Sequence, residues 1–522
     1  MCSRIDRSTS SDEKGSTPLD FISLLSLSPL GEFTDQRKSI SLILLCILLL
    51  SVLSMFNTIN HDSKKAHSLF YISHTPIFID GDSGFTASNL STGISSGIGT
   101  SSDPYIIEGW EINSWTSDGI HIENTQAHFI VRNCYSYSGV TNSYAGIYLE
   151  NCTHAVIRDN ICFLHDFGIF LHQSSEITIV NNTCSRFIGI NLEASSYNLI
   201  ENNNCSHSYN GISLLYSSTH NTVRGNECNN GSYGIALYES DNNSISDNAC
   251  NNNHGSFEIT YAITLNESAN NTLSNNSCQN NDIGIQLGSH SNYNTIINNS
   301  CDGGLYGNLV LGYDCDSNSL IHNNCTGGHD GITIYSSGNR VDNNSCSDNV
   351  RGIFFGCRGS FLTYIEVTSY DNIVCNNLLS NNSQYGIEII HASNNVIWNN
   401  TFIGNNHVTG SYSSSYPQAY DDGTDNRWNS SEGYGNYWSD WTGPDNSAPF
   451  GIVDSPYELA GSTGAKDYSP LTAPHVSITY GAPGLPPLIL GGIIIIIAIA
   501  ILFIIVMRRR KKSSEKPPLS GQ

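Results

Sequence analysis

The feature that most constrains the fold is a pair of short motifs that recur in phase about every 22 residues. The first motif, G-I-x-L or a close variant, begins at Gly119, Gly146, Gly168, Gly189, Gly211, Gly234, Ala262, Gly284, Asn308, Gly331, Gly352 and Gly386. The second motif, N-x-(I/L/V)-x-x-N-x-C, ends at Cys205, Cys228, Cys250, Cys301 and Cys346. Each period therefore supplies short strands separated by turns, as in a solenoid of stacked coils.

The register around each cysteine indicates which positions face the core. For nine cysteines from Cys162 to Cys346, the residue two before the cysteine is Asn, and the residue five before it is Ile, Leu or Val. In the last two coils Leu379 and then Phe402 replace the cysteine, so this position predicts a dry interior. Asn suits the corners because it tolerates left-handed dihedrals and its amide can bond to the next coil. We therefore predict an all-β fold, a right-handed parallel β-helix of about 12 coils with terminal transmembrane helices.

Two apolar segments bracket the repeats. Ile40 to Phe56 carries no charge and follows Arg37 and Lys38, which predicts a transmembrane helix, a signal anchor or a cleaved signal peptide. Leu488 to Met507 is apolar throughout and precedes five basic residues, which predicts a spanning helix with a stop-transfer flank. Basic residues favour the cytoplasmic side of a membrane. The repeats are therefore expected to lie outside the cell.

These features divide the chain into eight predicted segments. They are a cytoplasmic tail (1–39), a transmembrane helix or signal anchor (40–56), a linker and N-terminal cap (57–112), the parallel β-helix repeats (113–403), a Trp/Gly/Tyr-rich C-terminal capping module (404–472), a linker (473–487), a transmembrane helix (488–507) and a basic cytoplasmic tail (508–522).

The charge of the outer segment excludes one class of partner. Residues 57–487 hold 11 Lys and Arg against 39 Asp and Glu, a net charge of −28. Such a surface repels nucleic acid, so we expect no nucleic-acid partner. It attracts metal ions or simply keeps the protein soluble. Several Asn-x-Ser/Thr sequons, for example at Asn151 and Asn266, also suggest a glycoprotein.

The best candidate site lies on the outer face of the G-I-x-L strands. There, x and the residue after Leu point outward while Ile and Leu point inward. This pattern makes Glu150, His172 and Glu193 the candidate catalytic residues, with the two carboxylates about 9 to 10 Å apart and the imidazole between them. Tyr148 and Phe170 are the adjacent candidate ligand-binding residues. The alternative is a solvated sheet face that carries aromatic residues by chance.

Two further predictions concern the capping module and metals. Trp438 and Trp441 are candidate ligand-binding residues that offer a sugar-stacking face, although covering the last coil is an alternative role for them. We assign no metal-binding residues and expect no cofactor, because Met is rare and no His-rich tract exists for copper. Calcium is an alternative at Asp421, Asp422 and Asp425, or at Asp80 and Asp82, although Asx turns account for these acidic residues more simply.

The chain resembles a known family, the right-handed β-helix proteins similar to the periplasmic copper-associated protein NosD. The resemblance rests on DPYIIEGWEI near the start, the repeated G-I-x-L and N-N-x-C motifs, and GNYWSDW, DSPYELAG and DYSPL at the close, and it covers about Thr75 to Leu471. It implies the CASH domain type of carbohydrate-binding and sugar-hydrolysing proteins, a periplasmic or surface location and contact with polysaccharide. It does not fix an activity. The C-terminal segment also resembles archaeal surface-protein anchors, so we expect an archaeal origin.

Taken together, these patterns favour a protein of the cell membrane whose extracellular β-helix binds polysaccharide or a surface glycoprotein. The first alternative is a polysaccharide hydrolase, lyase or epimerase that acts through Glu150, His172 and Glu193. The second is a passive envelope or adhesion spacer, or a metal-related accessory protein of the NosD type.

Overall fold

The computed structural model describes residues 71–85, 92–138, 143–255, 258–356, 369–408 and 410–474. Every described residue belongs to one compact unit of the chain. The predicted spans 40–56 and 488–507 lie outside the described residues. Among the residues that the structure describes, no helix is both long and apolar enough to cross a membrane.

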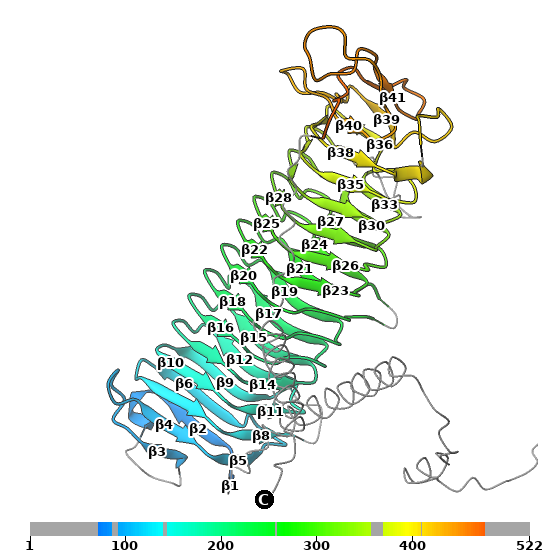
Figure 1. Ribbon diagram of the computed structural model, residues 1–522. Helices are drawn as coiled ribbons and strands as arrows, with labels where there is room; N and C mark the ends of the chain where they lie inside the picture. The colour runs from blue at the N-terminus through cyan, green and yellow to red at the C-terminus, as the bar shows by residue number, and fades with distance from the viewer. Residues whose placement is uncertain are drawn as a thin grey trace, which may run out of the picture. The chain divides into compact units, whose positions relative to one another are not determined.

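The described residues form a parallel β-helix, as the sequence predicts (Figure 1). The G-I-x-L motifs build one continuous sheet of 14 strands, which we call the site sheet. In spatial order its strands are β2 (Ile77–Asp80), β6 (Ile120–Thr125), β9 (Ala145–Cys152), β12 (Phe167–His172), β15 (Ile188–Glu193), β17 (Asn210–Leu215), β19 (Tyr233–Tyr238), β21 (Tyr261–Asn266), β24 (Ile283–Leu287), β27 (Gly307–Leu311), β30 (Asp330–Ile334), β33 (Arg351–Phe355), β36 (Ile387–Ser393) and β39 (Ala419–Thr424). The twelve predicted repeats correspond to β6 through β36, one strand each.

A second sheet of 14 strands runs beside the site sheet and begins with its one antiparallel pair, β3 with β4. Its strands are β3 (Ile94–Ser96), β4 (Tyr105–Glu108), β7 (Phe129–Arg132), β10 (Ala155–Arg158), β13 (Thr178–Val180), β16 (Leu199–Glu201), β18 (Thr222–Arg224), β20 (Ser244–Ser246), β22 (Thr272–Ser274), β25 (Thr295–Ile297), β28 (Ser319–Ile321), β31 (Arg340–Asp342), β34 (Ile373–Cys375) and β37 (Val396–Trp398).

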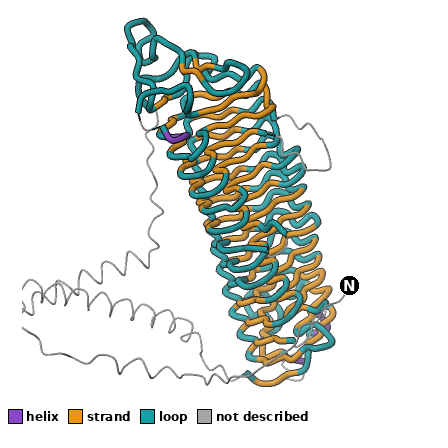
Figure 2. The backbone as a smooth tube through the Cα atoms, turned by 90° about the vertical axis from the view of Figure 1, so that its right-hand side faces the viewer, coloured by secondary structure: helices purple, strands orange, loops and turns teal. Residues whose placement is uncertain are grey.

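The third side of the coil is a sheet in two parts, joined by single bridges in the coils between them. The first part holds β1 (Ile72–His74), β5 (Trp110–Asn113), β8 (Tyr135–Tyr137), β11 (Ile161–Phe163) and β14 (Thr183–Ser185). The second part holds β23 (Ser277–Gln279), β26 (Ser300–Asp302), β29 (Asn324–Thr326), β32 (Ser345–Ser347), β35 (Leu378–Ser380), β38 (Thr401–Ile403) and β40 (Tyr437–Trp438). A short antiparallel pair, β41 (Tyr457–Glu458) with β42 (Lys466–Asp467), and two 3-10 turns, Asp82–Gly84 and Asn405–His407, complete the elements. Figure 2 shows how the strands of successive coils stack into these sheets.

The core consists of aligned apolar side chains from successive coils. Ile147 and Leu149 of β9 are fully buried, and they pair in register with Ile169 and Leu171 of β12. The cysteine column is buried as well, and the 13 cysteines of the described residues are free thiols. Burial raises the pKa of Cys134 to about 12, which keeps this thiol protonated. The prediction that the cysteine position faces a dry interior is confirmed.

At one corner of the coils, two neighbouring positions divide the roles predicted for Asn. One position makes the left-handed turn, and the next bonds to the adjacent coil. Asn181 and Asn202 adopt left-handed backbone angles, with φ of 56° and 54°. The next residue along, for example Asn182, is buried and forms the ladder instead. Its Nδ2 donates to Asn203 Oδ1 at 3.0 Å, and its own Oδ1 accepts from Asn160 Nδ2 at the same distance. One residue makes the turn and its neighbour joins the coils.

Coil strands extend into both regions that the sequence predicts as caps. Within 57–112, β2, β4 and β5 already pair in parallel with the first repeat strands, so the described part of this region already contains strands of the solenoid. Within 404–472, β39 and β40 continue two of the sheets. The ring of Trp438 then stacks on Phe402 of the last coil, with 4.1 Å between centroids. The closing aromatic residues thus cover apolar side chains that would otherwise meet water.

Candidate functional site

The outer face of the site sheet carries a column of acidic and imidazole side chains near its N-terminal end. Glu123 of β6 pairs in register with Glu150 of β9, which pairs with His172 of β12, which pairs with Glu193 of β15. We call these four residues the carboxylate column. The predicted order, with His172 between Glu150 and Glu193, is the order that the structure has.

A column of aromatic rings runs beside the carboxylate column. Phe78, His121, Tyr148 and Phe170, which we call the aromatic column, occupy the outward position of β2, β6, β9 and β12. Successive ring centroids lie 5.1, 4.6 and 5.1 Å apart, so the four rings form one continuous strip. Phe78 is 64% exposed, whereas the other three rings are half-buried. The strip therefore offers an amphipathic surface at the start of the solenoid.

His121 is held from both sides by carboxylates. Its Nδ1 lies 2.9 Å from Asp118 Oδ2, and its Nε2 lies 3.1 Å from Glu123 Oε2. The other oxygen of Asp118 accepts the backbone N–H of Ala145 at 2.7 Å, which fixes the carboxylate in place. Burial lowers the pKa of His121, but the hydrogen bonds to Asp118 and Glu123 outweigh it and raise the pKa above its usual value.

Glu150 lies between a phenol and an imidazole. The hydroxyl of Tyr148 donates to Glu150 Oε2 at 3.0 Å, and His172 Nδ1 lies 3.5 Å from Glu150 Oε1. Burial and the bond to Glu150 raise the pKa of Tyr148 well above its usual range, so the phenol keeps its proton and remains a donor. The charge of Glu193 adds to this rise. The structure thus brings together all five residues predicted on this face.

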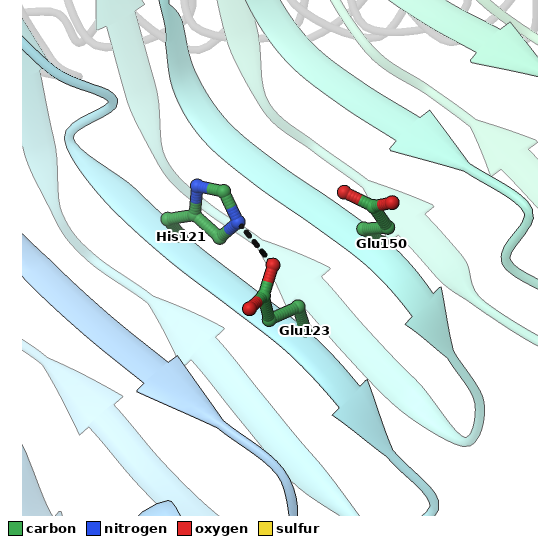
Figure 3. Close-up of side chains that lie close together, drawn as sticks. All are labelled: His121, Glu123 and Glu150. Atoms are coloured by element: carbon green, nitrogen blue, oxygen red, sulfur yellow. Dashed lines mark hydrogen bonds and ion pairs between the residues drawn. The ribbon is translucent and has the colours of Figure 1, made fainter.

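Figure 3 shows His121 and Glu123 on one strand and Glu150 on its neighbour. One donor atom from each of these three residues lies within 4.8 Å of the others, and no second such group of His, Cys, Asp and Glu occurs in the described ranges. Next to them is a pocket of about 290 Å³ lined by Pro76, Ile77, Phe78, Thr116, Ser117, Asp118, His121 and Tyr144. The pocket lies between the exposed Phe78 and the Asp118 side of the His121 ring.

The prediction that Trp438 binds a ligand is wrong for this structure. Trp438 is fully buried, and its ring is stacked between Phe402 at 4.1 Å and Tyr457 at 3.9 Å. Its indole N–H donates to the buried Asp467 at 3.0 Å. Both ring faces and the polar edge are therefore used within the fold. Trp441 is half-buried and donates to the Ser455 carbonyl, and its role toward a ligand stays a prediction.

Four of the five acidic residues considered for calcium, all except Asp425, accept hydrogen bonds from protein donors, and calcium at these positions stays a prediction. Asp421 is buried and accepts hydrogen bonds from Gly423 N, Asn426 Nδ2 and Trp428 Nε1. Asp82 accepts from the Thr125 hydroxyl and two backbone N–H groups, which lower its pKa against the opposing effect of burial. These contacts are those of structural turn residues.

His121 and Glu123 occupy the two outward positions of the G-I-x-L motif that begins at Gly119, but the sequence-based site includes neither them nor Asp118. The spacing of His121 and Glu123 at i and i+2 on a strand could have signalled a shared face. Nothing in the repeat signals Asp118, because it precedes the strand and reaches His121 through the local path of the turn.

The comparisons with known proteins concern the family and the fold. A family model described as "Periplasmic copper-binding protein (NosD)" matches residues 78–260, 139–305, 215–362 and 358–443 in overlapping segments. No curated protein sequence matches the chain.

Several solved structures are similar at low sequence identity. The periplasmic alginate epimerase AlgG is 12% identical, with a TM-score of 0.37, over 62% of this chain and 82% of that one. The A-module of a mannuronan C-5 epimerase from Azotobacter vinelandii is 13% identical, with a TM-score of 0.29, over 61% and 88%. The catalytic domain of an alpha-1,3-glucanase, in complex with tetrasaccharides, is 15% identical, with a TM-score of 0.33, over 69% and 64%.

The name of the matching family implies copper. The side chains that could bind it fit Cu(II) better than Cu(I). Cuprous copper prefers thiolate and thioether ligands. The cysteines of the described residues are all buried, and Met1, Met55 and Met507 lie outside those residues. The soft donors of the described solenoid therefore do not converge at its surface. His121, Glu123 and Glu150 instead offer one imidazole and two carboxylates, which fit a divalent ion, cupric copper included.

Proposed function

Since this chain belongs to the NosD family, whose model matches most of its length, we propose that it is a membrane-anchored extracellular β-helix protein that binds carbohydrate on the outer face of the site sheet. The bound region is the aromatic column with the adjacent carboxylate column. The predicted apolar spans and the basic tail support the anchoring and the outward orientation.

The observation that carries the proposal is the continuous strip of four rings beside a row of hydrogen-bonding side chains. Sugars present C–H faces and hydroxyl edges, so a binding surface for them needs apolar rings next to a few well-placed polar groups. Phe78 and Phe170 supply rings at the ends of the strip, and Glu123, Glu150 and His172 supply acceptors and donors along it. A chain of repeating sugars matches a surface that itself repeats from coil to coil.

A glycan array probed with the full-length chain in detergent tests this function. We expect retention of at least one polysaccharide class, and we expect Phe78→Ala combined with Phe170→Ala to weaken it about tenfold or more, or 1.4 kcal/mol. Phe163→Ala is the matched control. Phe163 is an exposed phenyl ring on β11, the strand before that of Phe170, and it lies on another side of the solenoid. Absence of retention, or equal losses in both variants, would reject the proposed surface.

A second candidate function is polysaccharide hydrolysis, lyase or epimerase chemistry through Glu150, His172 and Glu193. It is favoured by the register of these residues and by the 3.5 Å contact between His172 Nδ1 and Glu150 Oε1. Glu150 and Glu193 have one coil between them. A general acid and a general base are thereby arranged to act on opposite sides of a bound sugar. Incubation of the full chain with a polysaccharide panel should then give turnover that Glu150→Gln lowers at least about a hundredfold. Equal turnover by both proteins would eliminate Glu150 from the chemistry.

A further inference from the structure

The cluster of His121, Glu123 and Glu150 differs from an ordinary group of exposed acidic residues, because other side chains orient its members. Asp118 holds Nδ1 of the imidazole at 2.9 Å and is itself anchored by the N–H of Ala145. This arrangement leaves Nε2 directed at Glu123. A carboxylate behind a histidine is the usual outer shell of a metal-ligating imidazole, since it fixes the tautomer and the ring orientation.

The second carboxylate of the cluster has an outer shell of its own. Tyr148 of β9 lies in the aromatic column between His121 of β6 and Phe170 of β12. Its hydroxyl donates to Glu150 Oε2. The other oxygen, Oε1, lies 3.5 Å from His172. Two of the three potential ligands, His121 and Glu150, are therefore backed by named groups, and these groups come from three successive coils.

The spacing of the donor atoms is close to that of a bound ion. Ligand atoms of a tetrahedral site with bonds of about 2.1 Å lie about 3.4 Å apart. His121 Nε2 and Glu123 Oε2 are 3.1 Å apart, and the donor atoms of all three residues lie within 4.8 Å of one another. Since His121 and Glu123 are already at ligand spacing, binding requires the Glu150 carboxylate to move toward them. Three protein ligands also leave a fourth position for water.

We propose that His121, Glu123 and Glu150 bind one divalent first-row metal ion through His121 Nε2 and one oxygen of each carboxylate, with Asp118 and Tyr148 as positioning residues. One imidazole and two carboxylates form a borderline-to-hard set that takes Zn(II), and Cu(II) more tightly by the usual order of affinities. The inference goes beyond carbohydrate binding, because a chain that retains no glycan can still bind the ion.

The test is calorimetric titration of Zn(II) into the full-length, metal-stripped chain, purified in detergent without a histidine tag. We expect one site whose affinity falls by more than about tenfold in His121→Ala and in Glu150→Gln. Asp118→Asn is expected to weaken the site by about tenfold, because the carboxylate that orients the His121 ring is lost. His154→Ala is the matched control, since His154 Nε2 also contacts a glutamate, Glu176 at 2.9 Å, outside this cluster.

Cu(II) electron paramagnetic resonance supplies a second readout that does not depend on affinity. The wild type should show coupling to one ligand nitrogen, which His121→Ala abolishes and His154→Ala preserves. Circular dichroism of each variant establishes that the solenoid is intact. An unchanged Zn(II) isotherm in His121→Ala, an equal loss in His154→Ala, or the absence of a Zn(II) site in the wild type would each overturn the proposal.

Discussion

The hydroxyl of Tyr148 donates a 3.0 Å hydrogen bond to Glu150 Oε2, and this bond joins the aromatic column to the carboxylate column within a single strand, β9. One residue thereby presents a ring face to a ligand and holds a carboxylate in place. The two functions are separable, because the ring and the hydroxyl are different parts of the side chain.

Tyr148→Phe should separate them. The variant keeps the ring and removes the donor, so we expect glycan retention to stay within about threefold and Zn(II) affinity to fall about tenfold. Parallel array and calorimetry measurements on the same preparation check this prediction. Equal effects on both ligands would show that the hydroxyl serves the sugar surface directly.

The asparagine ladder should make a large contribution to stability. The side chain of Asn323 accepts from Asn299 N and Asn299 Nδ2 and donates to Ile296 O and Asn344 Oδ1. Asn323→Ala leaves buried backbone groups without these partners, which costs about 2 to 5 kcal/mol. The adjacent Asn324→Ala should change the denaturant midpoint very little, because that side chain is exposed. Similar midpoints for the two variants would contradict a structural role for the ladder.

The buried cysteines should resist thiol reagents. The chain has 16 cysteines, of which 13 are buried free thiols in the described residues. Burial raises the pKa of Cys152 and of Cys315 to about 12, so little thiolate forms near neutral pH. Titration with an aromatic disulfide reagent should therefore detect at most the remaining three thiols in the native protein, and at least 13 after denaturation. More reactive thiols in the native protein would contradict the packing, and fewer than 13 after denaturation would indicate disulfides between coils.

His165 should make the solenoid sensitive to acid. It is buried, its Nε2 lies 3.0 Å from Ser136 Oγ, and burial lowers its pKa to about 4. The unfolded chain, with a pKa near 6.5, binds the proton more readily than the folded one below that pH. Stability from this residue is thus fully present above pH 6.5 and is lost as the pH falls toward 4, by about 2 kcal/mol at pH 5.

Thermal unfolding of the wild type and of His165→Gln at pH 7 and pH 5 measures this loss. The difference between the two pH values should be larger for the wild type. Identical shifts in both proteins would show that His165 is not the residue responsible.

The features that sequence predicts well are those that the period alone determines. The G-I-x-L motif keeps its strand positions from coil to coil, so the outward direction of Glu150, His172 and Glu193 and their order across three coils follow from counting within the motif. The burial of Ile147 and the cysteine column follows in the same way. Register is a local property here, because each strand pairs with the next one along the chain.

The features that sequence predicts poorly depend on contacts outside the period. The turn residue Asp118 reaches the outward histidine of the following strand, and no repeat position encodes that contact. Trp438 belongs to the closing module, where Phe402 and Tyr457 enclose its ring. An aromatic-rich segment reads the same in sequence whether its rings close a core or face a ligand. Only the packing of this module separates the two roles.

Oxidative footprinting of the full-length chain tests the central claim most directly, with and without the polysaccharide that it retains best. Carbohydrate on the outer face of the first coils should protect Phe78, Tyr148 and Phe170 from labelling and leave Phe163 and Trp441 unchanged. Protection of Trp441 without protection of the aromatic column would contradict the account and place the binding surface in the closing module.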